Sequence, residues 1–394
     1  MLYWFTPTYP LDLIYNILNY LTTIFIIGAV GIKFKTEKKI FILLILTSAM
    51  PLLINGPFMP WYALSDQSKY LRNTMILRDF DTCLGDCYVR GEEEKDTRIH
   101  MVLSAYLWAL SPMPFIENYN SIGLINRLYL SLMIIFIATQ KNSKFFIYFL
   151  ILSPSLLLYS SAALRESFIV ITTMLTFYCL LKKRYYLLWL PLLFLLFTKI
   201  QNGVLVLLMS LAYLYIYTIH SRISKSSKLK YSTNILIIVT ATILFIAYGP
   251  ILLNAINIFA NSFGVEAARN SLDAKGSLGI VVYGNFFEVI IKLPIKLLAF
   301  FISPFPEIVS PIKAVFFLEN LFIILLLIIN FIRLYKKHLQ QFYYWFICFI
   351  MFSSMYALTV VNHGTISRYK LSYVVPFLFV LFYLNSKKYN EKTN

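Results

Sequence analysis

The stretch LFIILLLIINFIRLYKKH, residues 321–338, decides the fold of this chain. It begins as an apolar run and ends in a short connector that contains Arg333, Lys336 and Lys337. An apolar run of about 20 residues is long enough to cross a lipid bilayer as a helix. Connectors rich in Lys and Arg lie on the cytoplasmic side of a membrane. We therefore expect a transmembrane helix over residues 313–332, with its C-terminal end at the cytoplasm.

The same pattern recurs along all 394 residues, of which 59% are hydrophobic and 13% charged. It predicts an all-α, polytopic integral membrane protein in which residues 1–394 form a single transmembrane domain. About eleven helices cross the membrane in this prediction, with the N-terminus outside and the C-terminus inside. Their expected ranges are 12–32, 40–56, 121–139, 145–164, 167–181, 185–200, 203–219, 231–250, 313–332, 342–361 and 371–386.

The net charge of +17 belongs to one set of connectors. These connectors hold 19 of the 35 Lys and Arg residues but only two of the 18 Asp and Glu residues. They are residues 33–39, 141–144, 182–184, 220–230, 333–338 and the tail from residue 387. The excess positive charge therefore orients the protein in the membrane, and it does not predict binding to nucleic acid.

Two long segments, residues 57–120 and 251–312, fall on the outer face in this topology. Each contains an apolar stretch with several prolines and without a basic cluster on either flank, at residues 99–116 and 286–312. Irregular backbone at membrane depth is tolerated where it is buried in protein or lines a cavity. We expect an interfacial or re-entrant helix in each of these two outer loops.

Four cations, Arg165, Lys199, Arg269 and Arg368, fall at or near the outer ends of membrane segments. The positive-inside rule does not explain them there, and a cation at such a place usually has a functional reason. A guanidinium fits phosphate oxygens two at a time. We therefore expect these residues to bind an anion. Lys370, close to Arg368 in the chain, is interpreted as a side chain that snorkels to the interface.

Three residues are candidate general bases. Asp66 follows the second span, where its carboxylate is placed to accept a proton from a hydroxyl group or to cap a short helix. Glu166 is next to Arg165, and the two side chains either serve a site or simply pair with each other. His363 has a reference pKa near 6.5 that suits a general base, although a lone histidine is more often structural.

Several chemistries are excluded by missing motifs. The sequence has no phosphate-binding GxxxxGK[ST] loop, no GxGxxG fingerprint, no HExxH and no GxSxG elbow. We therefore expect an enzyme that does not use ATP and whose substrate arrives already activated. No metal motif is visible. Cys83 and Cys87 share an outer loop, where a disulfide is more plausible than a zinc site.

Four short stretches together resemble the O-antigen (Wzy-type) polymerases of bacterial inner membranes. They are residues 65–70, residues 154–166 ending in Leu-Arg-Glu, residues 294–306 with Ser-Pro-Phe-Pro, and Gly-Thr-Ile-Ser-Arg-Tyr-Lys at residues 364–370. The chain departs from many members in its modest outer loops. It also has Lys370 where related sequences often have Arg.

The resemblance implies glycosyl transfer at the periplasmic face of the inner membrane, without a cofactor. The donor would be a growing glycan on undecaprenyl pyrophosphate, the acceptor a new lipid-linked repeat unit, and a chain-length regulator an accessory partner. Asp66, Glu166 or His363 would activate the attacking hydroxyl. The substrate and its pyrophosphate would be bound by Arg165, Lys199, Arg269, Arg368 and Tyr369.

Other functions stay open at this point. An O-antigen ligase, or a glycosyltransferase with a polyprenyl-phosphate sugar donor, is barely separable by sequence. A flippase or transporter for lipid-linked sugars predicts charges buried inside spans and small outer loops. The unexplained cations singled out above are at outer ends of spans and the chain has two long outer loops, so transport is the weaker alternative.

Overall fold

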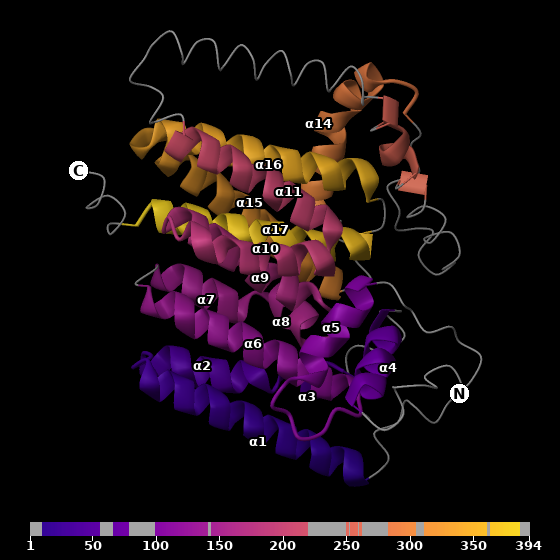
Figure 1. Ribbon diagram of the computed structural model, residues 1–394, viewed down its shortest axis with the longest axis vertical. Coiled ribbons are helices and arrows are strands. Elements are labelled where there is room, and N and C mark those ends of the chain that lie inside the picture. The colour runs from indigo at the N-terminus through magenta and orange to yellow at the C-terminus, as the bar shows by residue number, and fades with distance from the viewer. Residues whose placement is uncertain are drawn as a thin grey trace. The chain divides into compact units, whose positions relative to one another are not determined.

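The computed structural model describes residues 10–55, 66–78, 99–140, 143–219, 250–251, 253–258, 260–261, 283–304, 311–360 and 363–386. This part of the chain is all-helical (Figure 1). In chain order its principal helices are α1 (Pro10–Lys33), α2 (Lys38–Ser48), α3 (Met50–Ile54), α4 (Asp66–Arg78), α5 (Ile99–Ala109), α6 (Tyr119–Thr139), α7 (Lys144–Leu152), α8 (Pro154–Ser161), α9 (Glu166–Leu181), α10 (Tyr185–Thr198), α11 (Ile200–Leu214), the π-helix η3 (Tyr215–Ile219), α14 (Phe286–Ile302), α15 (Pro311–Lys337), α16 (Leu339–Thr359) and α17 (His363–Leu384).

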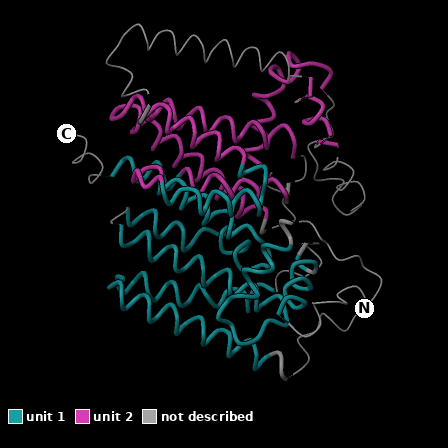
Figure 2. Tube along the Cα trace, in the orientation of Figure 1, with its two compact units in different colours: residues 1–179, 186–203, 378–394 teal, residues 180–185, 204–377 magenta. Residues whose placement is uncertain are grey.

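The chain divides into two compact units, drawn in different colours in Figure 2. Unit 1 comprises residues 1–179, 186–203 and 378–394, and unit 2 comprises residues 180–185 and 204–377.

Six of the described helices are long and apolar enough to cross a membrane. They are Leu13–Lys33, Tyr119–Thr139, Ile200–Tyr217, Lys313–Lys337, Leu339–Thr359 and Thr365–Leu384, close to six of the predicted spans. The pair α7 and α8, bent by 52°, makes a seventh if it is counted as one span. At the predicted spans 167–181 and 185–200, the apolar helices α9 and α10 have only 16 and 14 residues. Most of the predicted span 231–250 lies outside the described residues.

Two predicted spans are broken by proline. The predicted helix 40–56 divides at Ala49 into α2 and α3, and the predicted helix 145–164 divides at Ser153 into α7 and α8. Pro51 and Pro154 lie in the first turn of the second helix in each case, where the missing N–H of proline costs nothing. Ser153 caps α8 by accepting a hydrogen bond from the backbone N–H of Leu156 (3.3 Å). Both spans were expected to be continuous helices, which is wrong.

Unit 1 is built around α6, which packs against α1, α2, α3, α4, α7 and α8. Residues on most sides of α6 are buried, as expected of a helix at the centre of a bundle. Asn19 connects α1 to the start of α6 through two hydrogen bonds. Its amide donates to the Phe115 carbonyl (2.6 Å) and to the Ser121 hydroxyl (3.2 Å).

The first predicted outer loop contains two packed helices, α4 and α5. The prediction placed one interfacial helix at residues 99–116, but α5 ends at Ala109, before the prolines of that stretch. Helix α4 begins at Asp66, where a short helix was one of the two alternatives expected from the sequence, although no range was predicted for it. Trp108 of α5 is fully buried and contacts the ring of Tyr70 on α4, with ring centroids 5.2 Å apart. Trp108 also contacts the ring of Phe168 on α9, with centroids 5.5 Å apart, so the two helices pack against the rest of unit 1 as well as against each other.

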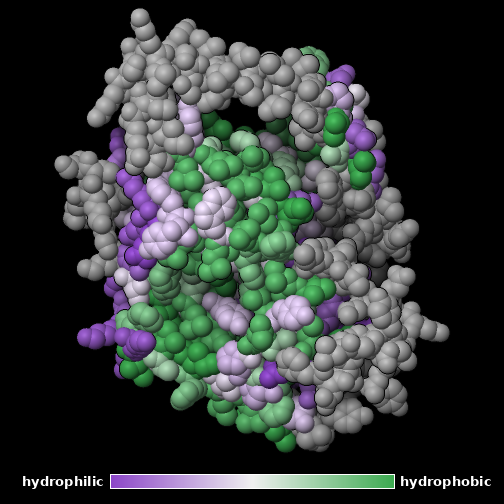
Figure 3. Space-filling view, viewed as in Figure 1, coloured by the Kyte–Doolittle hydropathy of each residue, from purple (hydrophilic) through white to green (hydrophobic). Residues whose placement is uncertain are grey.

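Unit 2 contains α14, α15 and α16, which contact one another pairwise. Helix α14 covers residues 286–302 of the second predicted interfacial stretch, 286–312, and the last two residues of that stretch belong to α15. Residues 305–310 lie outside the described residues. α14 buries Val289 and Phe300 on one face, while Phe287 and Ile295, which are more than 70% exposed, lie on the opposite face. Apolar side chains also cover much of the molecular face drawn in Figure 3. Such surfaces suit contact with lipid better than contact with water.

Candidate functional site

The connection between α8 and α9 carries two of the predicted site residues, Arg165 and Glu166. The helix α8 ends at Ser161, the chain runs through four non-helical residues, and α9 begins at Glu166. Ser161 to Leu164 are completely buried. Their small side chains permit this close approach of chain segments. The backbone of this connection therefore lies inside unit 1.

Polar side chains from three other segments satisfy the backbone of this buried connection. The Asn126 amide of α6 donates to the carbonyls of Ala162 and Leu164, at 2.9 Å each. The Asn55 amide, just after α3, donates to the Ser161 carbonyl (2.9 Å). In the opposite sense, the N–H of Ala163 donates to the Gln67 side chain of α4 (2.8 Å). We call Asn55, Gln67 and Asn126 the amide frame. Because unpaired backbone groups are costly in an apolar interior, this frame makes the irregular connection possible.

A glycine in α6 brings the helix backbone against the same connection. A Cβ atom on Gly123 would lie 2.2 Å from the Ser161 carbonyl oxygen and 2.9 Å from Pro51. No side chain larger than hydrogen fits there unless backbone moves. The backbone of α6 at Gly123 therefore lies directly against Pro51 of α3 and against the Ser161 carbonyl at the end of α8.

Arg165 points from the connection to the end of α10. Its guanidinium donates to the Thr198 carbonyl (2.8 Å), at the C-terminal residue of that helix. A helix C-terminus carries partial negative charge, so it favours a cation. Lys199 follows directly and is only 4% exposed, as is Glu166. Three predicted site residues, Arg165, Glu166 and Lys199, therefore belong to one neighbourhood in unit 1.

A further cation of unit 1, Arg127, was missed in the sequence analysis. It lies inside the membrane-crossing helix α6 and its side chain is 0% exposed. Its guanidinium donates to the hydroxyls of Thr47 (2.7 Å) and Ser160 (3.0 Å), while its Nε has no hydrogen-bond partner in the described part of the chain. A cation eight residues inside an apolar helix was visible in the sequence, and such residues are functional candidates by default. The expectation that the unexplained cations lie at the ends of spans is therefore wrong for Arg127, which lies inside a helix able to cross the membrane.

In unit 2, the segment between the predicted spans 342–361 and 371–386 was expected to be an outer loop, which is wrong because α17 already begins at His363. Arg368 and Tyr369 therefore project from a helix, with the guanidinium 5.3 Å from the ring centroid of Tyr369. Lys370 does not snorkel to the interface as expected. It is 3% exposed, and its ammonium donates to the carbonyls of Phe301 (3.1 Å) and Ser303 (2.7 Å) at the end of α14.

Several other predictions lie outside the described residues. These are Arg269, Cys83, Cys87 and the side chains of Asp66 and His363, although Asp66 is the first residue of α4. The described part of the chain contains no group of three or more His, Cys, Asp or Glu side chains arranged to hold a metal ion.

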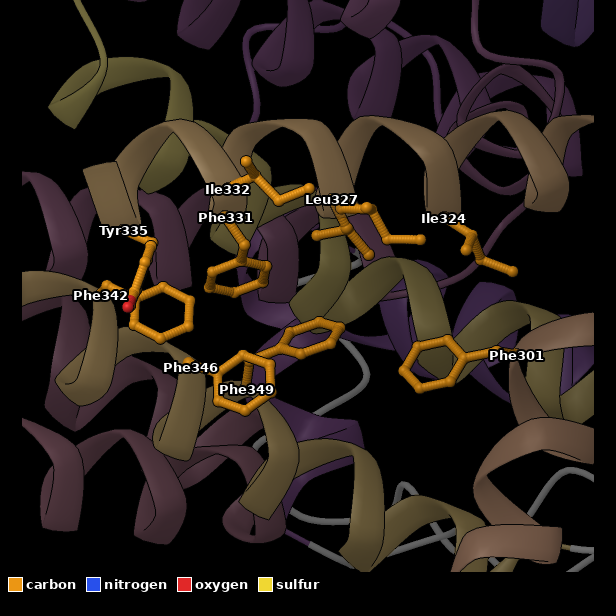
Figure 4. Close-up of a pocket in the computed structure, with 10 residues that line it drawn as sticks. Phe301, Ile324, Leu327, Phe331, Ile332, Tyr335, Phe342, Phe346 and Phe349 are labelled. Atoms are coloured by element: carbon orange, nitrogen blue, oxygen red, sulfur yellow. The ribbon is translucent and has the colours of Figure 1, made fainter. Parts of the chain in front are cut away.

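An apolar pocket of about 390 Å³ lies in unit 2 between α15 and α16 (Figure 4). The rings of Phe331 and Phe349 contact each other in its lining, with centroids 5.6 Å apart, and Phe301 lies at one end. Its lining is almost wholly hydrocarbon: Phe301, Ile324, Leu327, Ile328, Phe331, Ile332, Tyr335, Phe342, Phe346 and Phe349. Lys370 binds the carbonyl of Phe301, so a buried cation holds the backbone at that end of the pocket. The pocket suits a hydrocarbon chain and offers no group for acid–base chemistry.

Comparison with known proteins gives no relative for this chain. No family model, no curated protein and no solved structure matches it. The structure defines the class of protein: its described residues are all-helical, and they include six or seven helices able to cross a membrane.

Proposed function

We propose that this chain is a membrane glycosyltransferase that polymerises oligosaccharide repeat units carried on a polyprenyl pyrophosphate. The observation that carries the proposal is the neighbourhood of Arg165, Glu166 and Lys199 in unit 1. Arg165 precedes Glu166 in the chain and donates to the carbonyl of Thr198, the residue before Lys199, and the adjoining non-helical backbone is buried. Pyrophosphate is the leaving group that two preorganised cations would stabilise best.

We infer the side of the membrane from the ends of α9 and α10. The basic connector with Lys182, Lys183 and Arg184 joins the C-terminal end of α9 to the N-terminal end of α10. Arg165 and Lys199 lie at the opposite ends of these two helices. If the basic connector is cytoplasmic, the site faces the periplasm of a bacterial inner membrane. The proposal includes eleven spans, with the N-terminus outside and the C-terminus inside.

The reaction assigns a role to each group. An acceptor hydroxyl oxygen attacks the anomeric carbon of the donor sugar, a new C–O bond forms, and the bond to the pyrophosphate oxygen breaks. The electron pair leaves with the pyrophosphate, whose charge Arg165 and Lys199 stabilise. The hydroxyl proton passes to a general base, for which the carboxylate of Glu166 is the described candidate, with the carboxylate of Asp66 and the imidazole of His363 as alternatives.

Unit 2 supplies two further elements of the proposal. Arg368 and Tyr369 offer a cation and an aromatic face for the charged headgroup and the sugar. The apolar pocket lined by Phe331 and Phe349 offers a place for part of the polyprenyl chain. Arg269 joins the set of substrate-binding cations. A chain-length regulator is the expected protein partner.

The test uses a strain that lacks the chromosomal gene and carries a plasmid copy. Surface polysaccharide is separated on a gel after replacement of Arg165 by Ala. We expect the ladder of repeat units to collapse to a single repeat. The control is Arg184→Ala, an exposed arginine at the opposite end of the α9–α10 pair, which should leave the ladder intact.

The gel separates the alternatives. Loss of every repeat in Arg165→Ala would indicate a ligase or a flippase in place of a polymerase. An unchanged ladder for Arg165→Ala and Lys199→Ala, with both proteins present in the membrane at normal level, would overturn the site.

A further inference from the structure

Arg127 has an unusual set of neighbours for a buried cation. Within the described part of the chain, Arg127 forms no ion pair. Its guanidinium donates instead to two neutral hydroxyls. A buried charge without compensation is expensive, so its environment must supply negative potential in another form.

Two helix ends supply that potential. Thr47 is the next-to-last residue of α2, and Ser160 is the next-to-last residue of α8. Each helix C-terminus carries a partial charge of roughly −0.5, so two of them together offset about one positive charge. Arg127 thus binds the ends of α2 and α8 to each other through separate nitrogens of one rigid, planar group.

One of these two ends leads directly into the candidate site. Ser160 is five residues before Arg165, and the amide frame fixes the intervening backbone from Ser161 to Leu164. A shift of Ser160 would therefore be carried along a buried, hydrogen-bonded segment to Arg165, which contacts the end of α10. Asn126, the residue before Arg127, is itself part of the frame.

We propose that Arg127 is a positioning residue, which sets the place of Arg165 by holding the end of α8 against the end of α2. The catalytic half of this inference, an effect of Arg127 on the reaction, rests on the proposed function. The structural half, the effect of Arg127 on the position of α8 and Arg165, does not. Arg127 does not touch the substrate, because its side chain is fully buried.

The structural half is tested with a thiol reporter at Ser161. This side chain is 0% exposed and its hydroxyl has no hydrogen-bond partner among the described residues, so Ser161→Cys is a mild change. The four native cysteines are first replaced by serine or alanine. Labelling by a maleimide is then followed on protein purified in detergent, with a monodisperse elution profile as the criterion of folding.

We expect Arg127→Gln to accelerate labelling of Ser161→Cys by about tenfold or more, since a charge-assisted hydrogen bond to Ser160 is lost. Ser160→Ala removes the acceptor alone and should accelerate labelling several-fold in a protein that keeps its charge. Thr173→Val is the matched control, because the Thr173 hydroxyl is equally buried but bonds within its own helix. Unchanged labelling in both Arg127→Gln and Ser160→Ala would overturn the proposal.

The catalytic half is tested by a double-mutant cycle with Arg165→Ala. The rate of repeat-unit polymerisation is measured on purified protein with undecaprenyl pyrophosphate-linked repeat unit. If Arg127 acts through Arg165, Arg127→Gln lowers the rate about tenfold in the parent and less than about twofold in Arg165→Ala. Equal factors in both backgrounds would show a merely structural role and overturn the positioning assignment. Should Arg165→Ala leave polymerisation unchanged while labelling still responds to Arg127→Gln, the proposed function fails and the structural link stands.

Discussion

Replacement of Asn126 by Leu is the sharpest test of how the buried connection is held. The substitution keeps the branching at Cγ, although Leu is the larger side chain, and it removes three hydrogen bonds of 2.9 Å each. Two of them run from the Asn126 amide to the carbonyls of Ala162 and Leu164, and the third runs from the Trp108 indole N–H to the Asn126 oxygen. All these groups lie in the interior of unit 1.

The cost follows from counting which groups keep a partner. The Ala162 carbonyl still accepts the N–H of Leu164 (2.8 Å). The Leu164 carbonyl and the Trp108 N–H lose the Asn126 partner, and a buried polar group left unsatisfied costs about 1–3 kcal/mol. The expected loss is therefore about 2–6 kcal/mol. Side-chain hydrogen bonds in membrane proteins average about 0.6 kcal/mol, so three of them give about 2 kcal/mol, in agreement with the lower end.

The free energy of unfolding is measured by titrating the purified protein in mixed micelles with sodium dodecyl sulfate and following circular dichroism. Thr173→Val serves as the control, since its hydroxyl donates to the Ile169 carbonyl in the same helix and its removal orphans no buried group. We expect Asn126→Leu to be less stable than Thr173→Val by at least about 2 kcal/mol. A difference below about 0.5 kcal/mol would refute the view that Asn126 holds the connection.

Two further substitutions test local features of each unit. Gly123→Ala should destabilise unit 1 by about 1–3 kcal/mol in the same titration, because its Cβ would lie 2.2 Å from the Ser161 carbonyl oxygen. Gly28→Ala has open space around it and should be neutral or stabilising; equal effects of the two alanines would contradict the close approach. In unit 2, the hydrogen bond from Lys292 lowers the pKa of Glu288 below its ordinary value of 4.5. A lowered folded-state pKa means that the stability contributed by Glu288 is complete above pH 4.5 and disappears as the pH falls through the folded pKa. The melting temperature should therefore differ between the parent and Glu288→Gln at pH 6–7 and converge in acid, and a difference that is independent of pH would contradict this.

The sequence predicted the long apolar helices well, and the reason is physical. In a membrane span nearly every residue is apolar and every backbone group bonds within the helix, so length and hydropathy suffice. The helices α15 and α16 correspond closely to the predicted spans 313–332 and 342–361. The breaks at Ala49 and Ser153 were predictable in principle, since Pro51 and Pro154 interrupt the predicted spans.

The site was only partly predictable. Arg165, Glu166 and Lys199 were identified because charges at the outer ends of spans have no topological reason. Their proximity was not predictable, because it depends on a contact between the Arg165 guanidinium and the end of another helix. Lys370 was misinterpreted for a related reason. The carbonyls that bind its ammonium lie about 70 residues away in the chain, and no local pattern announces them.

Asn126 and Arg127 relate the buried connection between α8 and α9 to the charged residues at its end. Non-helical backbone inside a membrane protein needs hydrogen-bond partners for each carbonyl and N–H that is not bonded within a helix, and here polar side chains provide them. A bundle that needed only stability would continue α8 as an ordinary helix, with neither the amide frame nor a buried guanidinium. The chain instead carries Asn55, Gln67, Asn126 and Arg127 in its interior around one short connection. Because that connection ends at Arg165 and Glu166, the polar interior is best understood as the support of these two side chains.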